Sequence, residues 1–461
     1  MGAGLLESVN PANEDLVESY EIFDADRVEA ALAAASGASK DWRRSSWEER
    51  SRLLAGVAAE LRASNEEIAA IVTAEMGKPI RESLAEVEKC AWACDYYAEH
   101  GGEFLRPEAI EVEGRDVAVH KRPLGVVLAV MPWNYPLWQA MRCAAPIVAG
   151  GNCFLLKHAS NVTGCGLVLE RTFARAGAPA GVFSTLITPG SQVAPLIADD
   201  RIAAVTLTGS EGAGAAVGSA AGEALKPVVL ELGGSDPFIV LGDADLGKAI
   251  ETAVTARFQN AGQSCIAAKR FVVVGSIADD FEEGFAAAAA DLRRGDPLDP
   301  ETQLGPMARV DLRDELDEIV RRSLDGGGRI LTGGVAPEGP GAWYEPTVLG
   351  GLADQAAALR EETFGPVAAV VRAADERAAI AIANDSPYGL GCSLWTEDRD
   401  RAVALSAEIE AGMVFVNSMT ASDPRLPFGG VKRSGHGREL GGEIGMREFF
   451  NLQAVSIPRV V

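Results

Sequence analysis

The residue in this sequence best suited to covalent chemistry is Cys265, in the stretch from Phe258 to Arg270. Gly262, three positions before it, would let the backbone approach a ligand closely. Lys269 and Arg270 follow the cysteine and would favour the thiolate, the form that attacks electrophiles. The alternative is that Cys265 is a small apolar filler, as buried cysteines often are.

Other polar residues lie at or just past the ends of runs that are typical of buried strands. These runs are 125–130, 153–157, 205–208 and 228–231, and the polar residues are Asn134, Lys157, Ser160, Gly209, Ser210 and Glu231. In a parallel sheet the carboxyl ends of the strands meet at the edge where ligands bind. The sequence therefore predicts a ligand at this edge.

Helical periodicity separates these strands, at 138–148, 164–176 and 214–225, and this alternation predicts a doubly wound parallel sheet. Before it, 24–103 reads as a series of helices whose charged residues form a solvated face. After residue 243 the alternation of strands and helices restarts, which predicts a second α/β domain of similar build. Residues 110–121 alternate like a strand pair turning at 113–116, and the tail 448–461 alternates as a strand could.

Composition limits the classes of function. The chain has 461 residues, 48% of them apolar, and a net charge of −24. Such an acidic surface repels nucleic acid and anionic membranes, so we expect neither as a partner. The N-terminus does not read as a signal peptide and no apolar run reaches the length of a membrane span, so we expect a cytoplasmic protein.

Metal and disulfide chemistry are not indicated. The seven cysteines are scattered through apolar segments, which argues for a reducing compartment. Cys90 and Cys94 share a helical face, but no other pair completes a zinc-type pattern. The four histidines form no ligand cluster, so we expect no metal.

Seven motifs together resemble the aldehyde dehydrogenase superfamily along nearly the whole chain. They are Pro132-Trp133-Asn134, Leu156-Lys157, Thr208-Gly209-Ser210, the run from Glu231 to Gly234, the run from Gly262 to Cys265, the run from Glu361 to Pro366, and the run from Pro427 to Gly430. Within the superfamily the chain is most similar to bacterial NAD(P)-dependent succinate-semialdehyde dehydrogenases. The resemblance implies a Rossmann-like cofactor domain, an α/β catalytic domain and a small β oligomerisation element.

The mechanism that the resemblance implies is covalent. Cys265 attacks the aldehyde carbon, while the Asn134 amide and the Cys265 backbone N–H stabilise the oxyanion. Hydride transfer to the cofactor leaves a thioester on Cys265, which water activated by Glu231 hydrolyses. Relatives that transfer the acyl group to coenzyme A lack this glutamate, so Glu231 favours hydrolysis.

The resemblance also implies a nicotinamide cofactor. Gly209 and Ser210 begin a loose glycine turn before a helix, which suits a bound anion. Lys157 matches the lysine that holds the adenosine ribose, and Glu362, Phe364 and Trp133 match residues around the nicotinamide end. At the position of Ser160 many NAD-preferring members carry a glutamate, so we expect NADP in preference to NAD, with NAD still possible.

Arg142 and Ser422 match residues that hold the distal carboxylate of succinate semialdehyde in such enzymes. Arg142 lies two turns along a helix whose start Asn134 marks, so both could face one pocket. Some relatives have a second arginine where this chain has Gln259. The missing charge could come from Arg257, from Arg425 or from neither, which leaves a broad-specificity or other ω-carboxylated aldehyde dehydrogenase, for example for glutarate semialdehyde, as the alternative.

The resemblance implies a division into a cofactor-binding domain (1–109 and 123–232), a catalytic domain (233–440) and oligomerisation strands (110–122 and 441–461). We therefore expect a homodimer or homotetramer. Two rival classes stay open. A catalytically silent relative would lack Cys265, Asn134 or Glu231, and all three are present. A cysteine hydrolase would need a histidine beside the thiol, and none is near Cys265 in sequence.

Overall fold

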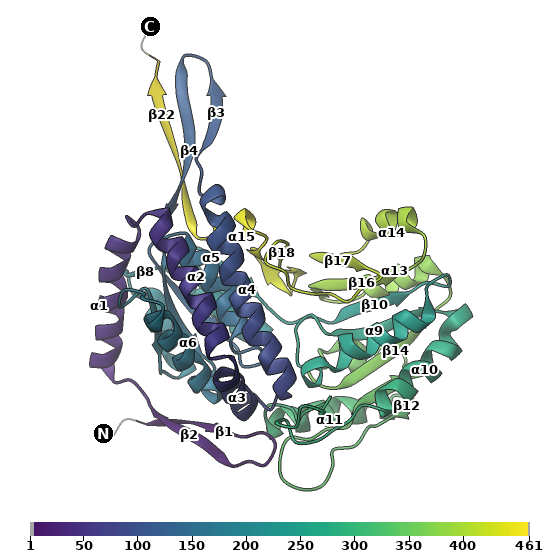
Figure 1. Cartoon of the computed structure of the whole chain (residues 1–461). Helices are drawn as coiled ribbons and strands as arrows, with labels where there is room; N and C mark the ends of the chain where they lie inside the picture. The colour runs from purple at the N-terminus through teal and green to yellow at the C-terminus, as the bar shows by residue number, and fades with distance from the viewer. Residues whose placement is uncertain (1–3, 460–461) are drawn as a thin grey trace.

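Two α/β bodies lie side by side in the computed structural model, which describes residues 4–459 (Figure 1). The first body is built on a six-stranded sheet in which neighbouring strands are parallel except for the first pair. In order across the sheet, the strands are β20 (Gly435–His436), β9 (Val228–Glu231), β8 (Ile202–Thr208), β5 (Val126–Met131), β6 (Cys153–His158) and β7 (Phe183–Leu186). The five parallel strands confirm the predicted doubly wound sheet.

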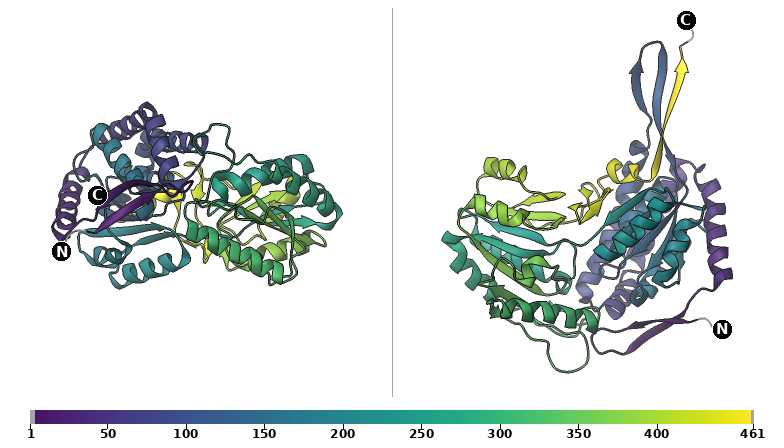
Figure 2. Two further views of the ribbon diagram at one scale, coloured as in Figure 1. Left: turned by 90° about the horizontal axis from the view of Figure 1, so that it is seen from below. Right: turned by 180° about the vertical axis from the view of Figure 1, so that it is seen from behind.

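The second body contains a seven-stranded sheet that is parallel except for its first pair. Its strands, in order across the sheet, are β12 (Arg329–Thr332), β13 (Thr347–Gly350), β14 (Val367–Ala373), β11 (Ala268–Val274), β10 (Asp236–Val240), β16 (Gly391–Trp395) and β17 (Met413–Val416). Its central strands β14, β11 and β10 are buried over most of their length because helices cover both faces of the sheet (Figure 2).

Helices surround both sheets. Those of the first body are α1 (Ala25–Trp42), α2 (Trp47–Ala63), α3 (Asn65–Met76), α4 (Ile80–Phe104), α5 (Trp138–Ala149), α6 (Thr163–Arg175), α7 (Val193–Ala198) and α8 (Glu211–Glu223). Those of the second are α9 (Leu246–Phe258), α10 (Ala278–Ala290), α11 (Val310–Asp325), α12 (Ala357–Arg360), α13 (Glu376–Asn384) and α14 (Arg399–Ser406). Local chemistry sets their ends: Ser46 and Glu49 form a capping box at the start of α2.

The expectation that the charged residues of the first helices form a solvated face was wrong for several of them. Glu75, Lys78 and Glu86 are buried. Glu86 pairs with Lys78, and its other oxygen accepts hydrogen bonds from the backbone N–H groups of Leu137 and Trp138. A carboxylate of α4 therefore caps the N-terminus of α5.

This cap also explains why α5 begins at Trp138, as the helical periodicity at 138–148 predicts, and not at Asn134, which was expected to mark its start. Pro136 disfavours helical backbone at Tyr135, the residue before it, so the segment from Asn134 to Leu137 is a turn. The sequence analysis did not predict the N-terminal hairpin formed by β1 (Leu5–Val9) and β2 (Leu16–Glu21).

An arm of three strands projects from the first body (Figure 1). β3 (Glu108–Val112) and β4 (Arg115–Pro123) form the expected hairpin, and β22 (Phe450–Pro458) pairs along the whole of β4. Before β22, the chain after residue 426 returns to the first body as β18 (Pro427–Phe428), β21 (Glu439–Leu440) and α15 (Glu443–Arg447). Within residues 4–459, none of the helices combines the length and apolar character that crossing a membrane requires.

Candidate active site

Cys265 lies in a loop between α9 and β11 that two buried cations hold from beneath. The Arg257 guanidinium donates hydrogen bonds to four backbone carbonyls, and Lys269 donates to the carbonyls of Ser264 and Cys265. Gly262 has a φ of +71°, and a Cβ there would lie 2.3 Å from the Gly365 carbonyl oxygen. Gly262 therefore allows close packing against the backbone of Gly365, whereas the sequence suggested close approach to a ligand.

Lys269 favours the thiolate as expected, but its effect is outweighed, and Arg270 is not among the groups that shift the Cys265 pKa. Burial raises the pKa of Cys265 well above its ordinary value, and Glu231 raises it further, against the smaller effects of Arg142 and Lys269. Arg270 donates all its hydrogen bonds to carbonyls of Ser235, Ile382 and Ala383. The resting thiol keeps its proton, so its reaction requires a base.

Glu231 is the carboxylate placed to act as such a base. It ends β9, its Oε2 lies 3.8 Å from the Cys265 Sγ, and its side chain is 1% exposed. Burial raises the pKa of Glu231 to about 8, although Arg142 opposes the shift. A carboxyl group with a pKa near neutrality can both accept and release a proton.

Asn134 is buried in the turn after β5, close to the Cys265 loop. One N–H of its side-chain amide donates to the Gln263 carbonyl at 3.1 Å, and Asn260 donates to the Asn134 carbonyl at 2.7 Å. An amide nitrogen carries two N–H groups, so the second is available to another acceptor. The network fixes the amide beside the thiol loop.

Arg142 contacts three protein groups through two of its nitrogens. Its Nη2 donates to Thr208 Oγ1 at 3.0 Å and to Glu231 Oε2 at 3.3 Å, and its Nε lies 2.6 Å from Glu439 Oε2. The side chain is 1% exposed and sits between two buried carboxylates. Glu439 was missed in the sequence because it lies far along the chain, on β21.

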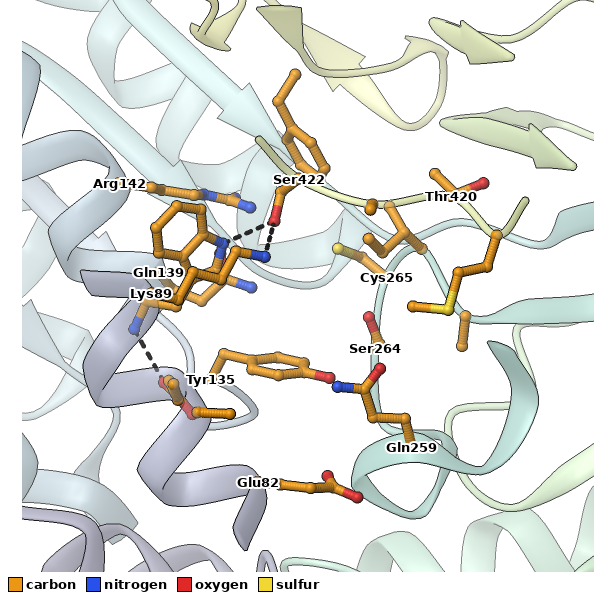
Figure 3. Close-up of a pocket in the computed structure, with 18 of the residues that line it drawn as sticks. Glu82, Lys89, Tyr135, Gln139, Arg142, Gln259, Ser264, Cys265, Thr420 and Ser422 are labelled. Carbon is orange, nitrogen blue, oxygen red and sulfur yellow. Dashed lines mark hydrogen bonds between the residues drawn. The ribbon is translucent and has the colours of Figure 1, made fainter. Parts of the chain in front are cut away.

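A cavity of about 150 Å³ lies beside the thiol, lined by Cys265 and Arg142 but not by Glu231 or Asn134 (Figure 3). It is smaller than the roughly 300–1,000 Å³ of sites for drug-sized ligands, which favours a small substrate. Cys265, Arg142 and Ser422 line it, as do Gln259 and Lys89. Lys89 was not predicted, although the spacing of Glu82, Glu86 and Lys89 places all three on one face of α4.

Neither candidate for a second substrate cation lies in this cavity. Arg257 is fully buried beneath the Cys265 loop, and Arg425 is an exposed side chain that pairs with Asp423.

The predicted cofactor residues form two groups. Lys157 lies near the end of β6 and Ser160 follows that strand, while Gly209 and Ser210 follow β8 at the edge of the first sheet, where Ser210 caps α8. Lys157 is buried, burial lowers its pKa, and within residues 4–459 no carboxylate pairs with it. A buried ammonium group without a partner fits a polar ligand at this edge.

The second group lies nearer the thiol loop. Glu362 accepts a hydrogen bond from the Gly234 N–H at 3.0 Å and pairs with Lys269 at 3.2 Å. The rings of Phe364 and Trp133 meet edge to face with centroids 5.6 Å apart. Among the described residues, no cluster of three potential metal ligands occurs.

Known proteins resemble this chain over its whole length. A succinate semialdehyde dehydrogenase of Escherichia coli K12, named for NAD(P)+, is 50% identical over 453 residues, which is 98% of each chain. A succinate-semialdehyde dehydrogenase of Mycobacterium tuberculosis H37Rv, named for NADP+, is 48% identical and covers 98% of this chain and 99% of its own. The crystal structure of succinic semialdehyde dehydrogenase from Streptococcus pyogenes, in complex with NADP+, superposes with a TM-score of 0.96 at 38% identity, over 98% of this chain and 100% of the other.

A family model described as the aldehyde dehydrogenase family matches residues 2–455. The fold, the motif order and these relatives agree, and the chain belongs to the aldehyde dehydrogenase family.

Proposed function

We propose that this protein oxidises succinate semialdehyde to succinate with NADP+ and that the acyl group is carried on Cys265. The observation that supports this most is a small cavity that Cys265 and Ser422 both line, together with the Glu231 Oε2 that lies 3.8 Å from the Cys265 sulfur. The names of the similar enzymes from Escherichia coli and Mycobacterium tuberculosis support the choice of substrate.

In the first step, Glu231 takes the proton of Cys265 as the sulfur bonds to the aldehyde carbon. The carbonyl oxygen becomes an oxyanion, which accepts hydrogen bonds from the free N–H of Asn134 and from the Cys265 backbone N–H. NADP+, when bound, supplies the hydride acceptor. The loss of hydride from the carbon restores its carbonyl and leaves a thioester on Cys265.

Glu231 first releases the proton it took from Cys265 to solvent. In the second step, the ionised Glu231 removes a proton from a water molecule that attacks the thioester carbon. The sulfur leaves, succinate is released and Cys265 regains its proton. Only ionised Glu231 can take this proton, so hydrolysis is fast above its pKa of about 8 and slows as the pH falls below it.

A pH profile follows from this. We expect kcat with butyraldehyde, an uncharged four-carbon aldehyde, to rise with pH and to level off above about pH 8. Initial rates of cofactor reduction between about pH 6 and 9.5, at saturating aldehyde, measure it. A kcat that stays constant over this range would exclude Glu231 as the rate-limiting base.

NADP+ fits the first-sheet edge through Lys157 and Ser160. The buried, unpartnered Lys157 ammonium would bind the polar adenosine end, and Ser160 brings no negative charge to repel a 2′-phosphate. Glu362, Phe364 and Trp133 would hold the nicotinamide end beside Cys265, and Gly209 and Ser210 would face the phosphates between. NAD+ remains the alternative cofactor.

The variant Ser160→Glu tests this assignment. A carboxylate facing the phosphate repels it. We expect kcat/KM for NADP+ to fall by about 10- to 100-fold, which corresponds to about 1.4–2.8 kcal/mol, while kcat/KM for NAD+ stays the same or rises. Ser160→Ala removes the hydroxyl without adding charge and is the matched control. Equal losses with both cofactors would place Ser160 outside the 2′-phosphate site.

For the substrate, Ser422 would donate to the distal carboxylate, and Arg142 would add positive potential behind it. A glutarate semialdehyde or broader aldehyde specificity is the second candidate, since the cavity has no second arginine at Gln259.

The two bodies and the arm would have different tasks. The body with the six-stranded sheet would bind the cofactor, and the body with the seven-stranded sheet would carry the thiol loop. The projecting arm would join subunits into a dimer or tetramer.

Product analysis tests the reaction as a whole. With succinate semialdehyde and NADP+, we expect proton NMR to show one succinate formed for each NADPH, without added coenzyme A. A requirement for coenzyme A would overturn hydrolysis by Glu231, and a failure to reduce either cofactor with any aldehyde would show a catalytically silent relative.

A further inference from the structure

Lys89 is a charged group inside the cavity that the reaction described above does not use. It lies on α4 and lines the same cavity as Cys265. Its Nζ donates a hydrogen bond to Ser422 Oγ at 2.8 Å and lies 4.5 Å from the centre of the Trp138 ring (Figure 3). The ammonium group is therefore held at a defined place in the wall.

The other cation of the cavity and one of its two carboxylates are already paired, while the second carboxylate, Glu82, accepts a hydrogen bond from the Asn260 N–H. Arg142 is placed between Glu231 and Glu439, and Glu86 pairs with Lys78. Within residues 4–459, no carboxylate oxygen lies within 4.0 Å of the Lys89 Nζ. Of the two cations that line the cavity, Arg142 has ion-pair partners and Lys89 has none among residues 4–459.

The hydrogen bonds of Ser422 indicate what would face Lys89. The Ser422 hydroxyl accepts from Lys89 Nζ at 2.8 Å and from Trp138 Nε1 at 2.9 Å. A hydroxyl has two acceptor sites and one proton. With both acceptor sites filled, its proton is left to donate, and the structure records no acceptor for it among the described residues. Lys89 and Ser422 together therefore offer N–H and O–H donors and a positive charge to one point.

We propose that Lys89 is the cation that binds the distal carboxylate of the substrate, with Ser422 as its hydrogen-bonding partner. The ligand class that completes this pair is a small anion with two acceptor oxygens, and a carboxylate fits it. Figure 3 shows Lys89 and Ser422 on one side of the cavity and the Cys265 sulfur pointing toward them from the other. An aldehyde that carries a carboxylate at its far end would span the two.

This assignment rests on the proposed function and completes it, because it supplies the charge that Gln259 does not. It also gives Arg142 a different task. The guanidinium holds the two buried carboxylates of the catalytic side, while the ammonium of Lys89 meets the substrate.

Lys89→Met tests the proposal with the full-length enzyme and NADP+. The readout is the ratio of kcat/KM for succinate semialdehyde to kcat/KM for butyraldehyde, which has the same carbon chain without the carboxylate. Hydrogen bonds to charged groups are strong enough that we expect the ratio to fall by about 10- to 100-fold. Lys89→Arg keeps the charge and should hold most of the wild-type ratio. Lys40→Met removes an exposed lysine and should leave it unchanged.

Succinate binding gives a second readout that does not depend on turnover. We expect the inhibition constant of succinate against succinate semialdehyde to rise in Lys89→Met by a factor similar to the fall in the ratio. An unchanged ratio in Lys89→Met, or a loss in Lys89→Arg as large as in Lys89→Met, would overturn the role of Lys89. If the wild-type enzyme itself shows no preference for succinate semialdehyde over butyraldehyde, the proposed substrate fails, and the role of Lys89 with it.

Discussion

Replacing Cys265 by alanine should lower kcat with succinate semialdehyde by on the order of 10⁴- to 10⁶-fold, the range seen when an enzyme loses its nucleophile. Alanine removes the only atom that can bond to the aldehyde carbon, so Glu231 has no proton to take from it. The substitution is small, and Arg257 and Lys269 would still hold the loop through backbone carbonyls. Initial rates of cofactor reduction measure the loss.

Cys392→Ala is the matched control, because Cys392 is an equally buried free thiol on β16, outside the cavity. We expect it to keep its activity. Quenching of tryptophan fluorescence by NADPH should show that Cys265→Ala still binds cofactor, which separates lost chemistry from lost folding. Turnover by Cys265→Ala above about 1% of wild type would mean that another group carries the acyl transfer.

Replacing Arg142 by methionine should destabilise the protein by about 3–5 kcal/mol, the usual cost of removing one partner of a buried ion pair. Methionine fills a similar volume but leaves Glu231 and Glu439 without their shared cation. The pKa of Glu231 is already raised, and the loss of Arg142 raises it further. A carboxyl group whose pKa is higher in the folded state than in the unfolded state destabilises the folded state as the pH rises. The loss of stability in Arg142→Met should therefore grow as the pH rises above the ordinary glutamate pKa of 4.5.

Urea unfolding followed by circular dichroism, at two pH values, measures this effect. Arg52→Met, which removes an exposed arginine of α2, should leave the midpoint unchanged. Glu439→Gln added to Arg142→Met should recover part of the loss, because one unpaired charge is then removed. Activity should fall with succinate semialdehyde and with butyraldehyde alike. A stable Arg142→Met protein that loses only the carboxylated substrate would show that Arg142, and not Lys89, binds the distal carboxylate.

The sequence was a good guide to the edge of the first sheet. Asn134, Lys157 and Glu231 come directly after runs of apolar residues, and such runs become central parallel strands because both of their faces are covered. Their positions follow from backbone direction alone. Cys265 was recognised from its motif, and its loop lies beside Glu231 as the motif implies.

What the sequence could not indicate depends on contacts between distant segments. Lys89 has the spacing of a solvated helix face, and only the packing of α4 against α5 places it in the cavity. Local patterns could not show that Glu231 and Glu439 share Arg142 as their cation, because the three residues are on elements far apart in the chain. The sign of the Cys265 pKa shift was misjudged because burial outweighs the nearby cations, and burial is a property of the folded chain.

The most direct test is the ratio of kcat/KM for succinate semialdehyde to kcat/KM for butyraldehyde in the wild-type enzyme with NADP+. A cavity that holds a carboxylate at one end and the Cys265 thiol at the other should favour succinate semialdehyde by at least about tenfold, the effect of one charged hydrogen bond. A ratio near one would contradict the substrate, and would leave a member of the aldehyde dehydrogenase family that does not recognise a distal carboxylate.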